Sequence, residues 1–198
     1  VKANGISTSL DKTTIIGGFT ADKLEKINLA GTAVTLTNAA TTKAVTIDAS
    51  ALTGNGAAAT ATQGLTITTG LKAGSTVIGS SVNDEVTLAL VAAVGSTFNL
   101  GAGDDKIHST VANLRTAAVY NTIDGGAGKD TLTITDGAAI TLIDDDFKGI
   151  TNVEAITIAT STTTDQSITT GGWYNANFKA AGSEITTVAT TGDITFAG

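Results

Sequence analysis

The chain has 198 residues, 41% of them hydrophobic, and a formal net charge of −7 at pH 7. This acidity argues against nucleic acid and anionic lipid surfaces as partners, and the absence of cysteine excludes disulfides, thiolate metal sites and cysteine nucleophiles. Aromatic residues make up only 4% and charged residues 15%, and 23 glycines are present, which favours thin β layers over a bulky globular core.

The first half of the chain reads as a lead-in followed by short strands. Residues 1–18 are polar and β-tending, and residues 19–26 predict a helical turn capped by Thr20 that precedes a strand over residues 27–29. Beyond it, pairs of apolar residues separated by one residue predict further strands, with outward-facing threonines between them. These pairs are Val34/Leu36, Val45/Ile47, Leu65/Ile67, Val86/Leu88, Leu132/Ile134, Ile140/Leu142 and Ile156/Ile158. We interpret Asp48 as a turn former, with a ligand role as the alternative.

Three turns in the middle of the chain share one register. Each ends in an aspartate, with an apolar residue seven positions before it and another two positions after it. The aspartates are Asp84, Asp105 and Asp130, and their apolar flanks are Val77/Val86, Phe98/Ile107 and Ile123/Leu132. The aspartates are 21 and 25 residues apart, which matches one coil of a parallel β-solenoid. Stacked coils would place the three turns above one another along one edge.

The residues of these turns have the chemistry of a calcium site. Glycine permits positive φ and lets carbonyl oxygens face inward, and Ca²⁺ takes six to eight oxygens at roughly 2.3–2.6 Å. We therefore expect calcium ions between successive turns, with ordinary β-turns as the alternative. Asp84, Asp105 and Asp130 are the expected carboxylate ligands, and Asp104 and Asp124 are extra oxygens nearby. The other candidate metal-site residues are Gly79, Asn83, Gly101, Gly103, Gly125, Gly126 and Gly128.

These turns carry a family resemblance. Residues 125–133 fit the nonapeptide G-G-x-G-x-D-x-U-x completely, residues 100–108 fit except for Leu100, and residues 79–87 keep the first glycine, the aspartate and the apolar residue. The chain thus resembles the secreted, calcium-binding repeats-in-toxin (RTX) family, although its copies are spread through longer coils instead of following one another in tandem. This spread, together with residues 44–54 and 147–156, is most similar to Gram-negative surface-layer (S-layer) proteins exported by type I secretion.

The last third of the chain suggests a module boundary and an end cap. Residues 24–30 align with residues 153–159, which suggests one complete module and the opening of another, joined near residues 143–152. There Asp144, Asp145 and Asp146 would start a short helix, since negative charge is favourable at a helix N-terminus. Trp173, Tyr174 and Phe178 would close an exposed solenoid end, with contact to a neighbouring subunit as the alternative. The tail, residues 193–198, resembles the acidic-then-apolar end of type I secretion signals.

Nothing in the sequence predicts an enzyme. His108 is the only histidine and has no second histidine or cysteine to act with, so we expect a surface residue. No nucleophile elbow is present. The glycine-rich turns lack the helix that follows a nucleotide-binding loop, and Asp130 would repel phosphate.

Together these features predict an all-β, right-handed parallel β-solenoid with long coils and one calcium-turn edge. The expected divisions are a lead-in over 1–18, a solenoid module over 19–142, and a short helix with the start of a second module or a cap over 143–198. The expected function is a structural, self-assembling surface-layer module outside the cell, with an RTX adhesin extender or the non-catalytic C-terminal part of a type I-secreted hydrolase as alternatives.

The expected partners are Ca²⁺ and other copies of the chain, and the resemblance further implies lipopolysaccharide contacts through regions outside this sequence. No run of about eighteen apolar residues predicts a membrane span. The chain begins at Val1 without methionine, which suggests an excised fragment.

Overall fold

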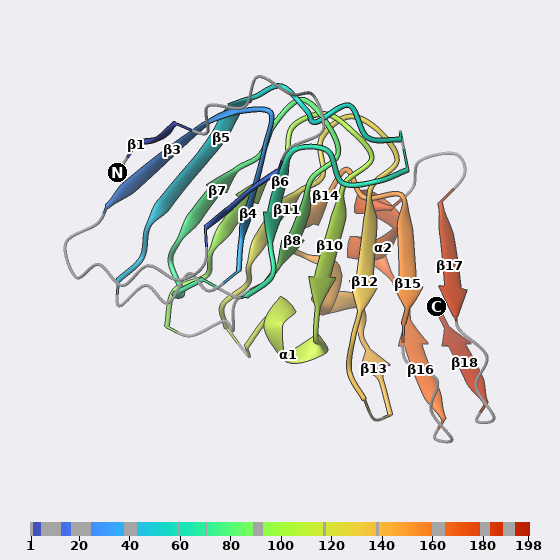
Figure 1. Ribbon diagram of the computed structural model, residues 1–198. Coiled ribbons are helices and arrows are strands. Elements are labelled where there is room, and N and C mark those ends of the chain that lie inside the picture. The colour runs from blue at the N-terminus through green and yellow to red at the C-terminus, as the bar shows by residue number, and fades with distance from the viewer. Residues whose placement is uncertain are drawn as a thin grey trace.

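The computed structural model describes residues 2–4, 13–16, 25–37, 43–58, 60–69, 71–88, 93–116, 118–137, 139–159, 165–178, 183–187 and 193–198. Across these ranges the chain winds as a parallel β-solenoid, in which successive strands alternate between two long sheets (Figure 1). Within this part of the chain every pairing between strands is parallel. The predicted all-β, parallel solenoid is confirmed.

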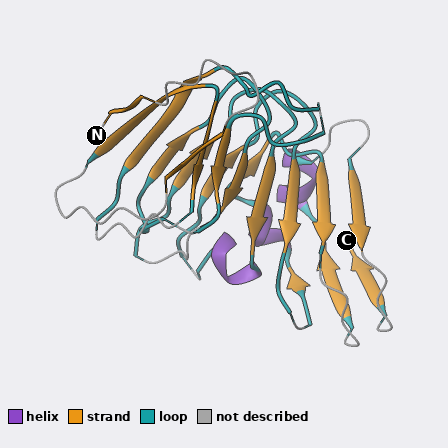
Figure 2. Cartoon of the chain, in the orientation of Figure 1, coloured by secondary structure: helices purple, strands orange, loops and turns teal. Residues whose placement is uncertain are grey.

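Two long sheets form the walls of the solenoid over the described ranges. The first has seven strands: β1 (Lys2–Asn4), β3 (Lys26–Gly31), β5 (Thr46–Leu52), β7 (Thr76–Ile78), β9 (Thr97–Asn99), β11 (Thr122–Asp124) and β14 (Ile150–Thr151). The second has eight: β2 (Thr13–Ile16), β4 (Ala33–Leu36), β6 (Leu65–Ile67), β8 (Glu85–Thr87), β10 (Lys106–Ser109), β12 (Thr131–Ile134), β15 (Ala155–Ile158) and β17 (Glu184–Thr187). Figure 2 shows that loops joining these strands stack along one edge.

A smaller sheet and three short helices complete the described structure. The sheet contains β13 (Thr141–Leu142), β16 (Gln166–Thr169) and β18 (Ile194–Ala197). The helices are α1 (Val111–Leu114), the 3-10 helix η1 (Asp144–Phe147) and α2 (Gly172–Asn177). No helix in these ranges is long and apolar enough to cross a membrane.

The core consists of apolar columns that run along the solenoid axis. Because neighbouring strands are parallel and in register, residues of like position stack from coil to coil, and the alternation of side chains along a strand turns every second one inward. In the seven-stranded sheet Val77 pairs with Phe98 and Phe98 with Ile123. In the eight-stranded sheet Val86 pairs with Ile107 and Ile107 with Leu132. All six side chains are buried, so the predicted register is confirmed.

Both residues of every predicted pair from Val34/Leu36 to Ile156/Ile158 are buried, and each pair has at least one residue in a strand, with Val45, Leu88 and Ile140 directly beside a strand end. The residues of the expected lead-in already contribute β1 and β2, which pair with β3 and β4. The expected strand over residues 27–29 lies in β3, and residues 19–24 of the expected helical turn lie outside the described residues.

Both long sheets continue past residue 142, where the module boundary was expected. Strand β14 extends the seven-stranded sheet, and β15 and β17 extend the eight-stranded sheet. The two aligned segments of the expected repeat take different places in the coil, because Ile27 lies in the seven-stranded sheet and Ile156 in the eight-stranded sheet.

An aromatic cluster packs where the seven-stranded sheet ends at β14. The Phe147 ring meets the rings of Tyr174 and Phe178 edge-on at 5.2 and 5.3 Å, and the latter two rings stack at 5.2 Å. Helix α2, which carries Tyr174, packs against η1 of the preceding coil. The expectation that Trp173, Tyr174 and Phe178 close one end of the solenoid stays a prediction. Trp173 is 41% exposed, and Lys148 Nζ lies 5.4 Å from its ring centroid.

Asp144 begins the 3-10 helix η1 and caps a second helix, α2. It is the first residue of η1, as expected, and its carboxylate accepts the backbone N–H of Trp173 at 3.1 Å and of Tyr174 at 2.9 Å. A carboxylate there satisfies N–H groups that have no partner within α2. The carboxylate therefore ties α2 to η1.

We expect the Phe98→Ala substitution to destabilise the fold by about 3–5 kcal/mol, because it leaves a cavity in a fully buried column. Urea unfolding followed by circular dichroism measures this. Thr97→Ala, on the exposed face of the same strand, is the matched control and should cost less than about 1 kcal/mol. Similar losses for the two variants would contradict the assignment of Phe98 to the core.

Candidate functional site

The three predicted turns stack along one edge of the solenoid. The turn over 79–84 joins β7 to β8, the turn over 100–105 joins β9 to β10, and the turn over 125–130 joins β11 to β12. Backbone hydrogen bonds join one turn to the next: Ala102 N–H donates to Ser80 O at 3.3 Å, and Ala127 N–H donates to Gly101 O at 2.9 Å. The sequence therefore placed the three turns correctly relative to one another.

Asp84, Asp105 and Asp130 form a buried column, here called the aspartate column. All three side chains are 1% exposed or less. The N–H of Asp84 donates to Asp105 Oδ1 at 2.7 Å, and the N–H of Asp105 donates to Asp130 Oδ1 at 2.8 Å. The N–H of Asp130 in turn donates to Glu154 Oε2 at 2.9 Å. One oxygen of each carboxylate thus links its coil to the preceding coil.

The second oxygen of each carboxylate distinguishes Asp84 from Asp105 and Asp130. Asp105 Oδ2 and Asp130 Oδ2 are buried and have no hydrogen-bond partner. By contrast, Asp84 Oδ2 accepts the N–H of Ser80 at 2.6 Å, and its Oδ1 accepts the N–H of Leu65 at 2.6 Å and the hydroxyl of Ser80 at 2.8 Å. Of the three aspartates, Asp105 and Asp130 are therefore the ones with a carboxylate oxygen that has no hydrogen-bond donor.

Glycine is required in these turns by close stacking and by backbone conformation. Gly101 and Gly126 have φ of 100° and 102°, which side chains rarely adopt. A Cβ on Gly126 would overlap the carbonyl oxygen of Gly101, and a Cβ on Gly101 would overlap that of Ser80. Gly103 and Gly128 also have positive φ, of 125° and 142°. Gly79 and Gly125 sit against Leu100 O and Asn152 O in the same way.

A second, outer column of polar side chains also bonds turn to turn. Asn83 Oδ1 accepts the N–H of Asp104 at 2.8 Å, and Asp104 Oδ1 accepts the N–H of Lys129 at 2.8 Å. Asp124 Oδ1 accepts the side-chain amide of Asn152 at 2.7 Å. These contacts occupy one carboxylate oxygen each of Asp104 and Asp124.

Burial and like charge make the aspartate column electrostatically costly. Loss of hydration, followed by the charges of Asp84, Asp130 and Asp104, raises the pKa of Asp105 to about 8. Burial, with the charges of Glu154, Asp104 and Asp124, raises the pKa of Asp130 to about 6. A nearby cation would reverse both effects, because opposite charge favours the ionised carboxyl.

The residues of the edge fit calcium in donor type and in charge. Two unpartnered, buried carboxylate oxygens lie on neighbouring coils, and Asp104, Asp124 and Glu154 add negative charge around them. Across the described ranges, however, no three acidic or histidine side chains converge into a metal-binding group. Backbone carbonyls of the turns would have to supply the remaining oxygens, as the glycine pattern implies.

Glu154 was missed by the sequence analysis, although the signal for it exists. It lies two residues before the buried Ile156, as each column aspartate lies two residues before a buried apolar residue. The predicted pattern has an aspartate after a glycine-rich turn, whereas Glu154 follows Asn152-Val153. The Ser80 contacts to Asp84 were also not anticipated.

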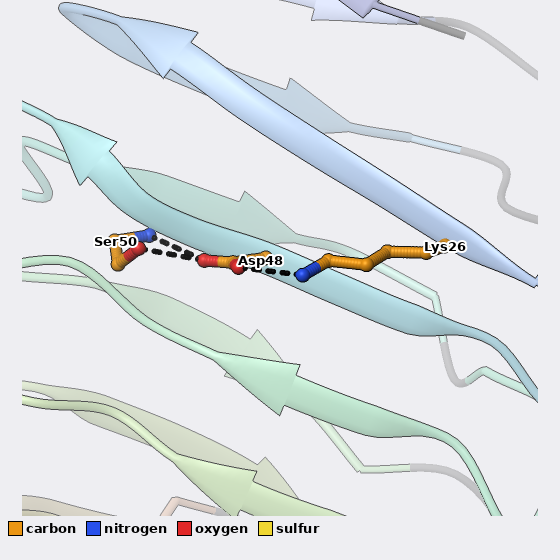
Figure 3. Close-up of polar contacts among 3 residues, drawn as sticks. All are labelled: Lys26, Asp48 and Ser50. Atoms are coloured by element: carbon orange, nitrogen blue, oxygen red, sulfur yellow. Dashed lines mark hydrogen bonds and ion pairs between the residues drawn. The ribbon is translucent and has the colours of Figure 1, made fainter.

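The remaining candidates lie outside the three turns. Asp48 is on β5, where its carboxylate accepts the N–H and hydroxyl of Ser50 at 3.2 and 2.7 Å and pairs with Lys26 Nζ at 3.0 Å (Figure 3). It lies within β5, beside an irregularity in the β3–β5 pairing, and not in a turn between strands as interpreted from the sequence. His108 is partly exposed on β10, and its Nε2 lies 3.0 Å from Glu85 Oε1.

Comparisons with protein-family models, curated proteins and solved structures found no match to this chain.

We expect the metal-free protein to lose stability as the pH rises from about 4 to about 8. The folded state raises the pKa of Asp105 to about 8 from an ordinary 3.8, so the native protein holds a proton that the unfolded chain releases across this window. Urea unfolding in chelator at pH 5 and pH 8 measures the difference. Asp105→Asn keeps an oxygen acceptor and cannot titrate, so its stability should depend less on pH. An equal pH dependence in the variant would contradict this assignment.

Proposed function

We propose that this chain is a structural calcium-binding module of a bacterial surface layer, and not an enzyme. The observation that carries the proposal is the pair of buried carboxylate oxygens, Oδ2 of Asp105 and of Asp130, that have no hydrogen-bond partner. An ion held there would bridge two coils and neutralise carboxylates that burial and mutual repulsion disfavour. In this role Asp105 and Asp130 supply carboxylates, and the turns containing Gly101, Gly126 and Gly128 supply carbonyl oxygens.

Calcium at this edge would couple folding to location. Calcium is scarce in the cytosol and plentiful outside the cell, and a ligand that binds only the native state adds stability in proportion to the logarithm of its concentration. The module would therefore be loose before export and compact after it. This behaviour suits a chain exported by type I secretion, as the resemblance to RTX surface-layer proteins implies.

The outer faces of the sheets support a role in lateral assembly. A row of threonines crosses the seven-stranded sheet in register, one per coil: Thr46, Thr76, Thr97 and Thr122. A second row crosses the eight-stranded sheet through Thr133, Thr157 and Thr186. Such regular, flat rows suit repeated contacts between copies of a solenoid in a sheet.

We expect calcium to raise the melting temperature, and Asp130→Ala to reduce this increment more than Asp84→Ala does. The carboxylate of Asp130 has an unpartnered oxygen, whereas that of Asp84 is filled by backbone and hydroxyl donors. Calcium at 100 times its dissociation constant would add about 2.7 kcal/mol per site. Melting in calcium and in chelator, followed by circular dichroism, gives the increment for each protein. Equal increments in the two variants would contradict this ranking of the turns.

We expect the purified protein to form two-dimensional lattices in calcium and to lose them in chelator, because neutralised edges and regular outer faces allow close lateral packing. Electron microscopy of both samples tests this. Calcium-stabilised monomers without lattices would instead favour the extender module of an adhesin, in which the same rod only carries a distant binding tip.

A further inference from the structure

The turn over 79–84 differs from its two neighbours at one position that faces the aspartate column. In the second place of the turn it has Ser80, where the other turns have Gly101 and Gly126. Gly101 and Gly126 have positive φ, and Asn152 is the one non-glycine residue with positive φ in the described ranges, so Ser80 keeps an ordinary backbone conformation.

This difference coincides with a difference in the carboxylates. The N–H of Ser80 donates to Asp84 Oδ2 at 2.6 Å, and its hydroxyl donates to Asp84 Oδ1 at 2.8 Å. The corresponding Oδ2 atoms of Asp105 and Asp130 have no partner. At the Asp84 level the residue in the second place of the turn therefore donates to both carboxylate oxygens, through its N–H to Oδ2 and its hydroxyl to Oδ1, whereas at the two levels with the positive-φ glycines Oδ2 has no donor.

Further contacts surround the carboxylate of Asp84 and the side chain of Ser80. The Ser80 hydroxyl oxygen lies 2.9 Å from Val82 O and accepts the N–H of Val82 at 3.2 Å, so the hydroxyl also holds the turn backbone. On the other side, Gly64 lies so close that a Cβ on it would overlap both Asp84 Oδ1 and Ser80 Oγ. Both carboxylate oxygens of Asp84 thus already have a donor, Leu65 and Ser80 at Oδ1 and Ser80 at Oδ2, unlike those of Asp105 and Asp130.

We propose that Ser80 takes the place of a cation at the Asp84 level, so that the edge binds ions only at the levels of Asp105 and Asp130. The 79–84 turn is then a metal-independent anchor, and the serine or glycine in the second place of each turn decides whether that turn binds calcium. This inference rests on the proposed calcium role of the edge.

The test gives the turn over 79–84 the glycines of its two neighbours. Ser80→Gly combined with Val82→Gly gives residues 79–84 the glycines that its neighbours have at 101 and 103. Ser80→Ala is the matched control, because it removes the hydroxyl and keeps the backbone N–H and conformation. Isothermal titration with CaCl₂ alone should find one more ion per chain in the double variant than in the wild type, and no gain in Ser80→Ala. A folded double variant that binds the same number as the wild type overturns the inference.

Hydrogen exchange of the unaltered protein gives a second, independent reading. Amides of residues 79–84 should be equally protected in calcium and in chelator, whereas those of residues 100–105 and 125–130 should gain protection in calcium. A calcium-dependent gain over 79–84 as large as in the other turns overturns the inference even if the double variant does not fold. A wild type that binds no calcium would instead reject the proposed function itself, so the two failures are distinguishable.

Discussion

The structure depends on buried carboxylates that accept backbone N–H groups from the preceding coil. At the corner where the chain passes into the eight-stranded sheet, the N–H groups of Asp84, Asp105 and Asp130 bond to side chains of the following coil. Buried N–H groups need such partners. The aspartates therefore hold the coils in register whether or not an ion is present, and the glycines that allow close stacking serve the same contact.

The aspartate column also brings carboxylates of like charge together in a buried corner. Carboxylates one coil apart in a desolvated corner repel one another, and burial raises the pKa of Asp84 as well as those of Asp105 and Asp130. Such a column of carboxylates can be stabilised in three ways: by protonation, by a bound cation, or by hydrogen-bond donors to the ionised carboxylates. At the Asp84 level donors from Ser80 and Leu65 fill that role.

The sequence was sufficient for the repeat register and insufficient for the contacts within it. An aspartate flanked by apolar residues at fixed distances predicted that Phe98 and Ile107 share their positions with the flanks of the other two turns, because parallel stacking preserves position from coil to coil. It could not show that the N–H of Ser80 donates to the carboxylate of Asp84, since that depends on the direction of one peptide group. The capping of α2 by Asp144 was equally hidden, because the two residues it bonds lie about 30 positions away.

The hydrogen bonds of the column all run in one direction, and this gives the rod a polarity. Each aspartate N–H of one coil is accepted by a carboxylate of the coil that follows it in the sequence. A chain that coils up from its C-terminal side finds every acceptor already in position when the next donor arrives. A chain that coils up from its N-terminal side instead finds the acceptors of the outer column in position, because the N–H of Asp104 donates to Asn83 Oδ1 of the coil before it. The inner and outer columns therefore favour opposite orders of coil formation.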